Sequence, residues 1–320
     1  MIRLTLVAGL LLALSCTHGP RGTTSPSALA PGEYDRVLNG VRLHYRIGGR
    51  GSAGRPPLLF LHGGPGYNSF SFAQLTGRRF EDSERMVYLD QRGCGGSERP
   101  WTRDYALATL VADVEALRRA LGVERWVVMG HSFGGTLALE YAARHPEAVA
   151  GLIVVDGFSD APGTYRSWAR ALEEWHARTL PQGEEAGFQQ VMTALQGLDT
   201  KGFFDRMQWV DARQREEMER VDARSGLRNT GELSGALFGG ELKAYRFASH
   251  ARVQAPALVI IGRHDRAIGP ETSRALAEAL PHGTYLEYEN SAHFPYLEEA
   301  ERFEQDVRRF LATLRPTQAQ

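Results

Sequence analysis

A serine flanked by glycines has the residue type and spacing of a hydrolytic nucleophile. It is Ser132, in the segment GHSFGG at 130–135. The apolar run at 125–129 precedes this segment and a helix-like stretch follows it, so the pattern predicts a sharp strand-to-helix turn with an exposed hydroxyl. Glycines suit the flanking positions because side chains there would collide with the neighbouring strand and helix. The bare pattern also fits an inert turn, and further residues must decide.

A serine hydroxyl becomes a good nucleophile only when a base takes its proton and a carboxylate orients that base. Asp265 follows the β-rich run at 257–262, and His293 follows a predicted last strand at 284–288. Side chains at the carboxyl ends of parallel strands meet at one edge of a sheet. We therefore predict a triad of Ser132, Asp265 and His293. Their order along the chain is that of α/β-hydrolases.

Acyl transfer also needs N–H donors for the developing oxyanion. The glycine-rich turn at 62–66 follows the apolar strand at 57–61 and can bring its amides close to a substrate carbonyl. We assign the oxyanion hole to the amides of Gly64 and Phe133, since Pro65 has no N–H. His62 is interpreted as a residue that orients this loop.

The elements that position these residues alternate between strands and helices. This alternation predicts an α/β fold with a mostly parallel central sheet flanked by helices. Strands are expected at 41–47, 57–61, 86–90, 125–129, 151–156, 257–262 and 284–288, with helices such as 107–121 and 134–145 between them. The mostly helical stretch at 157–248, with helices at 165–180, 184–196 and 203–224, predicts a cap inserted between two parts of the core, 33–156 and 249–320.

The N-terminus has the pattern of an export signal. Arg3 precedes an apolar run at 4–14 that is too short to span a bilayer, and the end at Cys16 resembles a bacterial lipobox. We expect residues 1–16 to be a signal peptide, 17–32 a flexible tether, and lipidated Cys16 an anchor in the cell envelope. The alternative is a plain secretory signal and a periplasmic or secreted protein.

Composition excludes several functional classes. The chain has 320 residues, 42% of them hydrophobic and 23% charged, with a net charge of −1 and no basic block. These values argue against disorder and nucleic-acid binding. We expect no metal and no cofactor, because HExxH and paired CxxC spacings are missing and Glu98 stands where a dinucleotide fingerprint needs glycine. Cys94 is interpreted as a small buried residue in a turn.

Four motifs together resemble the proline iminopeptidase family of α/β-hydrolases. They are HGGPG at 62–66, DQRGCGGS at 90–97, the turn at Ser132, and SAH at 291–293. The resemblance extends from about Tyr34 to Leu314. It implies that acidic residues of the cap hold the free α-amino group of a peptide, and Glu232 is the best match, ahead of 173 and 174. The turn departs from the GGSWG of many members, which leaves esterase-like relatives open.

These observations predict a serine hydrolase acting on a small peptide or aminoacyl substrate. The expected activity is that of an aminopeptidase that releases N-terminal proline or another small apolar residue through an acyl-enzyme. A carboxylesterase or lactonase could use the same triad, and a catalytically silent binding protein could share the fold. An epoxide hydrolase or haloalkane dehalogenase is disfavoured, because those relatives carry aspartate where Ser132 stands.

Overall fold

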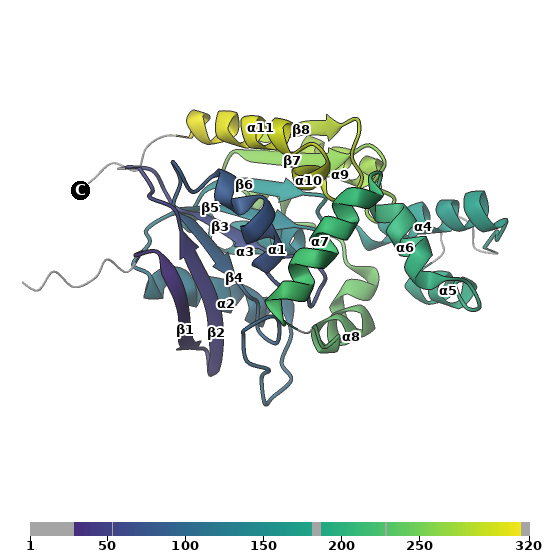
Figure 1. Ribbon diagram of the computed structural model, residues 1–320, viewed down its shortest axis with the longest axis horizontal. Helices are drawn as coiled ribbons and strands as arrows, with labels where there is room; N and C mark the ends of the chain where they lie inside the picture. Colours follow the sequence, from purple (N-terminus) through teal and green to yellow (C-terminus); the bar gives the residue numbers. More distant parts are fainter. Residues whose placement is uncertain (1–28, 53, 181–186, 228, 315–320) are drawn as a thin grey trace, which may run out of the picture.

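A central eight-stranded sheet organises the molecule (Figure 1). The computed structural model describes residues 29–52, 54–180, 187–227 and 229–314, so the predicted signal peptide and Cys16 lie outside the described residues. The strands are β1 (Gly32–Leu38), β2 (Val41–Gly48), β3 (Leu58–Leu61), β4 (Met86–Leu89), β5 (Trp126–His131), β6 (Val149–Val155), β7 (Ala257–Gly262) and β8 (Gly283–Tyr288). None of the helices in these ranges combines the length and apolar character needed to cross a bilayer.

The order of the strands is β1-β2-β4-β3-β5-β6-β7-β8. Strand β2 runs antiparallel to β1 and β4, and every pairing from β4 to β8 is parallel. The predicted α/β-hydrolase fold is thus confirmed. Strand β1 is an addition to the sequence prediction. Its side chains are mostly exposed, so its sequence, GEYDRVL, lacks the apolar signal that marks the inner strands.

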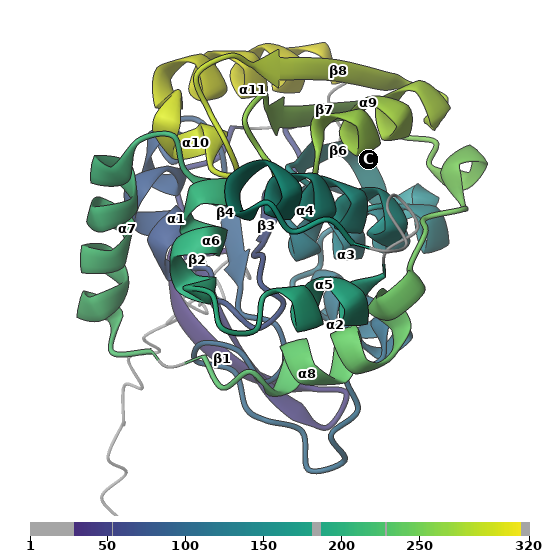
Figure 2. The same cartoon turned by 90° about the vertical axis from the view of Figure 1, so that its right-hand side faces the viewer.

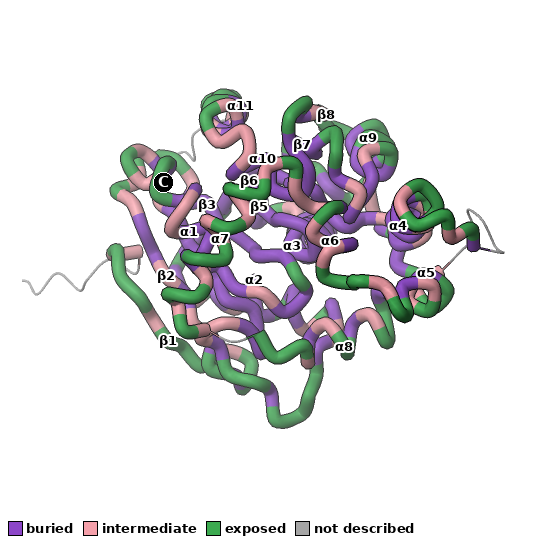
Figure 3. Tube along the Cα trace, turned by 45° about the vertical axis from the view of Figure 1, so that its right-hand side comes forward, coloured by how far each residue is buried: buried purple, intermediate pink, exposed green. Residues whose placement is uncertain are grey.

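Helices cover both faces of the sheet, and alternate strand residues serve the two layers. On one face lie α2 (Leu107–Ala120), α3 (Phe133–Arg144) and α9 (Pro270–Ala279), and on the other lie α1 (Phe70–Leu75), α10 (Pro295–Glu298) and α11 (Ala300–Thr313). In β5, Val128 packs into the first layer, and Val127 and Met129 pack into the second. Strands covered on both sides read as continuous apolar runs. Figure 3 shows them buried beneath helices with exposed outer faces.

The segment between β6 and β7 forms a group of helices beyond the carboxyl ends of the strands (Figures 1 and 2). These are α4 (Ala161–His176), α5 (Phe188–Ala194), α6 (Thr200–Gln208), α7 (Ala212–Ser225) and α8 (Glu232–Gly239). The residues expected to form the cap thus face the sheet edge where Ser132, Asp265 and His293 lie.

The single helix predicted at 203–224 is wrong, because the structure has two helices, α6 and α7, with a break at 209–211. Asp211 caps α7 by accepting from the Arg213 amide at 2.9 Å. Glu298, from α10, accepts from the amides of Val210 at 2.7 Å and Asp211 at 2.9 Å. The break is therefore stabilised by Glu298, a half-buried residue far along the chain, and the helical periodicity of residues 203–224 does not predict it.

Candidate active site

Ser132 stands at the turn between β5 and α3 in a strained conformation. Its φ is 55° and its ψ is −121°, a region that L-residues rarely occupy. Its amide donates to the Val155 carbonyl at 2.9 Å, and its carbonyl accepts from Gly135 at 2.8 Å and Phe158 at 3.1 Å. These bonds tie the turn to the end of β6, so the surrounding structure holds the strain.

The two glycines of the turn are required by close backbone approach. A Cβ at Gly134 would lie 2.0 Å from the Leu61 carbonyl oxygen, and one at Gly130 would lie 2.1 Å from the carbonyl oxygen of Gly134. Any side chain at either position would force the strand, the turn and the helix apart. The spacing recognised in the sequence therefore has a steric cause in the fold.

Asp265 and His293 form a buried pair at the ends of β7 and β8. The Asp265 side chain is 0% exposed and that of His293 is 6% exposed, and Oδ2 of Asp265 lies 2.9 Å from Nδ1 of His293. The other carboxylate oxygen accepts from the amides of Ala267 at 2.7 Å and Ile268 at 3.1 Å. Since a carboxylate only accepts hydrogen bonds, Nδ1 carries the proton and Nε2 of His293 is left as a base.

The predicted oxyanion donors lie on the same cavity as Ser132 and His293. Gly64 has a φ of +113°, and a Cβ there would meet the Gly66 nitrogen at 2.5 Å. The peptide bond between Gly64 and Pro65 is cis. Within the described part of the chain, the amides of Gly64 and Phe133 donate to no protein acceptor. Both donors are therefore available to a substrate oxygen.

The loop after β4 holds the glycine-rich loop after β3 in place. The Gln91 amide donates to Nε2 of His62 at 3.1 Å, and the Gln91 side chain donates to the His62 carbonyl at 2.8 Å. Because Nε2 accepts, Nδ1 of His62 is the donor to the Gly63 carbonyl at 2.9 Å. His62 is thus a neutral ring that orients the loop, as expected from its place at the start of the glycine-rich turn.

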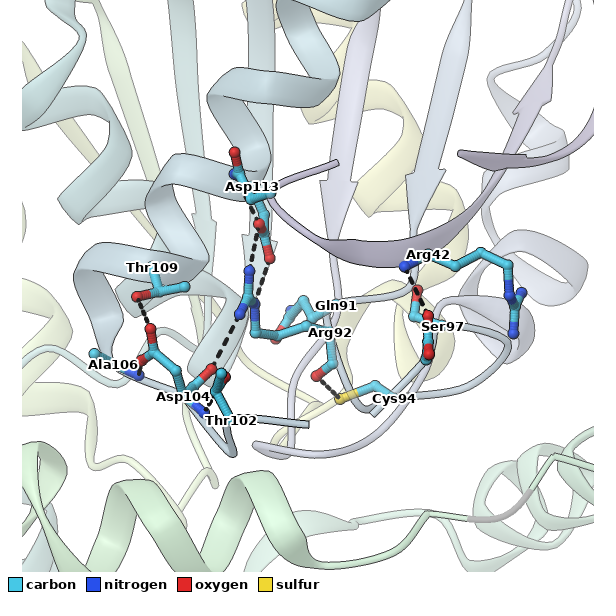
Figure 4. Close-up of polar contacts among 12 residues, drawn as sticks. Arg42, Gln91, Arg92, Cys94, Ser97, Thr102, Asp104, Ala106, Thr109 and Asp113 are labelled. Carbon is cyan, nitrogen blue, oxygen red and sulfur yellow. Dashed lines mark hydrogen bonds and ion pairs between the residues drawn. The ribbon is translucent and has the colours of Figure 1, made fainter. Parts of the chain in front are cut away.

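A buried ion pair anchors this loop in turn (Figure 4). Arg92 donates to both carboxylate oxygens of Asp113 on α2, at 2.6 and 2.7 Å, and to the Asp104 carbonyl at 3.1 Å. Cys94 lies in the same loop with 1% of its surface exposed, and burial raises the pKa of its thiol. Cys94 is therefore an inert packing residue.

A cavity of about 410 Å³ opens beside Ser132 between the core and the cap. Its aromatic lining comes mostly from the cap and from the loops at the sheet edge. Its tyrosine, tryptophan and phenylalanine residues are Tyr67, Phe133, Phe158, Trp168, Phe188, Phe204, Phe238 and Phe294. In the described ranges, no aspartate or glutamate side chain lines this cavity. The cavity suits an apolar group attached to the reacting carbonyl.

The cap carboxylate favoured by the sequence, Glu232, lies at the start of α8 and outside the described lining of the cavity. It accepts from the Tyr105 hydroxyl at 3.0 Å and lies 3.9 Å from Arg99. Of the weaker candidates, Glu173 accepts from Thr179 and Glu174 accepts from Arg266.

Asp222 on α7 is a carboxylate near the cavity that was not predicted from the sequence. It accepts from the hydroxyl of Tyr67, and Tyr67 lines the cavity. Its Oδ1 is buried without a hydrogen-bond partner in the described structure, and burial raises the pKa of this carboxyl. Only the fold brings Asp222 to the glycine-rich loop, so its position in the sequence gives no signal.

Two further residues near Ser132, Asp265 and His293 were not predicted from the sequence. Nε2 of His131 donates to the carbonyl of His293 at 2.8 Å, and burial lowers the pKa of His131 well below its usual range. His131 therefore holds the histidine loop as a neutral ring. Asp156, directly after β6, is 0% exposed and lies behind Asp265. Its place at the end of a predicted strand is a signal that could have identified it.

Known proteins share this architecture. Residues 56–300 match the family model described as the alpha/beta hydrolase fold. A curated proline iminopeptidase from Heyndrickxia coagulans is 30% identical over 267 residues, which cover 79% of this chain and 89% of that protein. One from Neisseria meningitidis serogroup A is 31% identical over 256 residues, covering 70% of this chain and 79% of that protein.

Among solved structures, a proline iminopeptidase-related protein from Thermus thermophilus superposes with a TM-score of 0.77 at 25% identity. The match covers 90% of this chain and 99% of that one. The chain therefore belongs to the proline iminopeptidase family of α/β-hydrolases.

Proposed function

We propose that the protein is a serine hydrolase that forms an acyl-enzyme on Ser132. The observation that carries the proposal is the buried hydrogen bond between His293 and Asp265, 2.9 Å long, at the cavity that Ser132 also lines. A carboxylate on Nδ1 fixes the tautomer of the ring and stabilises the imidazolium that forms when Nε2 accepts a proton. Ser132 stands on a strained turn, as the nucleophile of this fold does, and it lines the cavity although the residue is only 8% exposed, so the prediction of an exposed hydroxyl is wrong.

The proposed reaction has two steps. In the first, His293 takes the proton of Ser132 as its oxygen attacks the substrate carbonyl, and the amides of Gly64 and Phe133 hold the oxyanion. His293 then gives the proton to the leaving group. In the second step, His293 activates water, which releases the acyl group from Ser132.

The substrate class we propose is peptides with N-terminal proline or another small apolar residue. Similarity to the curated proline iminopeptidases supports this assignment. The apolar cavity suits the side chain of such a residue. Tyr67 lines the cavity, and Asp222 lies behind Tyr67 and accepts a hydrogen bond from its hydroxyl. A buried carboxylate oxygen without a partner gains a charge-assisted hydrogen bond when a substrate ammonium group approaches.

The second candidate is a carboxylesterase or lactonase. The observation that favours it is the lining of the cavity, which has no carboxylate side chain among the described residues. A neutral acyl group would fill such a cavity without any partner for an ammonium group.

Replacing the nucleophile tests the proposal. Ser132→Ala should lower kcat by roughly four orders of magnitude or more, since the members of a triad act as one unit. A fluorophosphonate should add one covalent label to the wild type, detected by mass spectrometry, and none to the variant. Ser234→Ala is the matched control, because Ser234 lines the same cavity and has no part in the proposed chemistry.

Four substrates distinguish the two classes on the same preparation. They are proline arylamide, alanine arylamide, an N-blocked arylamide and a short-chain aryl ester. Turnover of the free arylamides and not of the blocked one supports the aminopeptidase, and turnover of the ester and the blocked substrate alone supports the esterase. Near-wild-type turnover by Ser132→Ala on every substrate would remove Ser132 from the reaction.

A further inference from the structure

A second carboxyl group lies directly behind the proposed triad. Asp156 follows β6, is 0% exposed, and has a φ of 46°. Its amide donates to the Ile260 carbonyl at 2.8 Å, and its Oδ1 accepts from the Gly262 amide at 3.0 Å. Both contacts are to β7, so the backbone aims the Asp156 side chain toward the loop that carries Asp265.

The other carboxyl oxygen of Asp156 has no hydrogen-bond partner in the described structure. Oδ2 is buried, and no donor in the described ranges reaches it. One oxygen of Asp156, one oxygen of Asp265 and one ring nitrogen of His293 all lie within 4.8 Å of one another. Two carboxyl groups buried this close together cannot both be ionised at moderate cost, so one of them keeps a proton.

The hydrogen-bond partners decide which carboxyl keeps the proton. Asp265 accepts from two amides on Oδ1 and faces Nδ1 of His293 with Oδ2. Asp156 accepts from a single amide, that of Gly262. Three donors favour the charged form at Asp265, and one donor with a bare oxygen favours the acid at Asp156.

The electrostatic surroundings of Asp156 agree with this assignment. Burial raises the pKa of Asp156 well above its usual range, the negative charge of Asp265 raises it further, and Glu298 adds to the effect, while the Gly262 amide opposes it. Among the described residues, His293 and the hydroxyl of Tyr296 also face Asp156. Within the described ranges, neither a lysine nor an arginine is among the largest influences on the pKa of Asp156.

We propose that Asp156 is a neutral carboxylic acid that donates its proton in a hydrogen bond to the Asp265 carboxylate. Asp156 is then a positioning residue, which acts on His293 only through Asp265. The pair carries one negative charge in total, the charge that the imidazolium of His293 needs opposite it. This inference rests on the proposed function for its kinetic test.

Two substitutions show whether Asp156 acts as a hydrogen-bond donor or as a negative charge. Asp156→Asn keeps the shape, a donor for Asp265 and an acceptor for Gly262, and should keep kcat within roughly threefold of the wild type. Asp156→Ala removes the donor and should lower kcat about ten- to a hundredfold, as expected for a lost hydrogen bond to a charged group, with little change in KM. Equal losses in both variants would overturn the proposal.

The pH profile of kcat/KM gives a second readout, because a change in the packing around Asp156 alone would not shift the pKa on its acid limb. An ionised Asp156 would stabilise the imidazolium of His293, so its neutralisation in Asp156→Asn would lower the pKa on the acid limb of kcat/KM by about one unit or more. A neutral Asp156 leaves that limb where it is in the wild type. A downward shift of this size therefore contradicts the proposal. Asp306→Asn, which neutralises a buried carboxyl bonded to Tyr288, is the matched control.

An infrared measurement tests the proton directly and does not depend on activity. At neutral pH the wild type should show the carbonyl stretch of a protonated carboxylic acid, and Asp156→Asn should lack it while Asp306→Asn keeps it. Absence of this band from the wild type would overturn the proposal. Running the same spectra on Ser132→Ala keeps the two questions apart, because failure of the proposed hydrolase function leaves the infrared result intact.

Discussion

Three buried histidines lie around Ser132, and their hydrogen-bond partners give them different chemistry. Burial lowers the pKa of His62 and of His131, and each ring serves as a neutral link between loops. His293 is the one of the three with a carboxylate on its ring nitrogen, at Asp265. In the proposed reaction, a proton taken from Ser132 is therefore stabilised at His293, and the other two rings hold the loops around it.

The proposed recognition of a substrate amine needs a carboxylate, and the structure offers two candidates, Asp222 and Glu232. Asp222→Asn should lower kcat/KM for proline arylamide by roughly one to two orders of magnitude, because it removes a charge-assisted hydrogen bond. Glu232→Gln should have a smaller effect, since both oxygens of Glu232 face protein partners, Tyr105 and Arg99, whereas Oδ1 of Asp222 has none in the described structure. Steady-state kinetics of both variants on proline arylamide and on a neutral aryl ester measure the difference.

The ester is the internal control for this comparison. A folding defect depresses both substrates together, whereas loss of amine recognition depresses only the charged one. If Glu232→Gln shows the selective loss and Asp222→Asn does not, the assignment returns to the residue that the sequence favoured. Equal losses on the two substrates in both variants would remove both carboxylates from amine recognition.

At the scale of elements, the loops that follow β3 and β4 act as one unit. Gln91 holds His62, and Arg92 fastens the same loop to α2 through Asp113. Arg92 is 2% exposed and Asp113 is 3% exposed, so neither charge can be solvated by water if its partner is removed. The position of the proposed oxyanion amide at Gly64 therefore depends on an ion pair in another element.

Removing one partner of this pair should be costly. Arg92→Ala should destabilise the protein by about 3–5 kcal/mol, because Asp113 is then a buried charge without its cation. Urea unfolding followed by circular dichroism measures the change. The double variant Arg92→Ala/Asp113→Ala should be more stable than Arg92→Ala alone, since it contains no unpaired charge. Additive losses in the double variant would show that the two side chains do not interact.

The elements that carry local signals were predictable from the sequence, and those set by distant contacts were not. Inner strands read as apolar runs, and glycines around Ser132 mark a turn that sterics require, so the fold and the meeting of Ser132, Asp265 and His293 at one sheet edge were predictable from the chain. The break between α6 and α7 depends on Glu298, and the role of His131 depends on the His293 carbonyl. Such contacts join residues far apart in sequence, where periodicity and spacing carry no information.

For the molecule as a whole, charge is balanced and organised in pairs. The chain has 37 lysines and arginines against 38 aspartates and glutamates. Most of the ion pairs lie at the surface, where water screens them and each contributes little. A few ion pairs are instead buried and connect elements inside the fold, and Glu115 belongs to one of them. The Glu115 carboxylate, on α2, accepts hydrogen bonds from Arg118 and Arg119. It also accepts one from the hydroxyl of Tyr141, on α3.

These partners make Glu115 a source of pH-dependent stability. Arg118, Arg119 and Tyr141 outweigh the effect of burial and lower the pKa of Glu115 from its ordinary 4.5 to about 2. A depressed pKa in the folded state stabilises the protein above the unfolded value, and this stabilisation is lost as pH falls from about 4.5 toward 2. Glu115→Gln should therefore cost about 1–2 kcal/mol near pH 7, after allowance for solvent screening, and much less near pH 3. Urea unfolding of the wild type, Glu115→Gln and the exposed control Glu124→Gln across this range gives the difference at each pH. A difference that stays constant down to pH 3 would assign the stabilisation by Glu115 to packing and neutral hydrogen bonds instead of its charge.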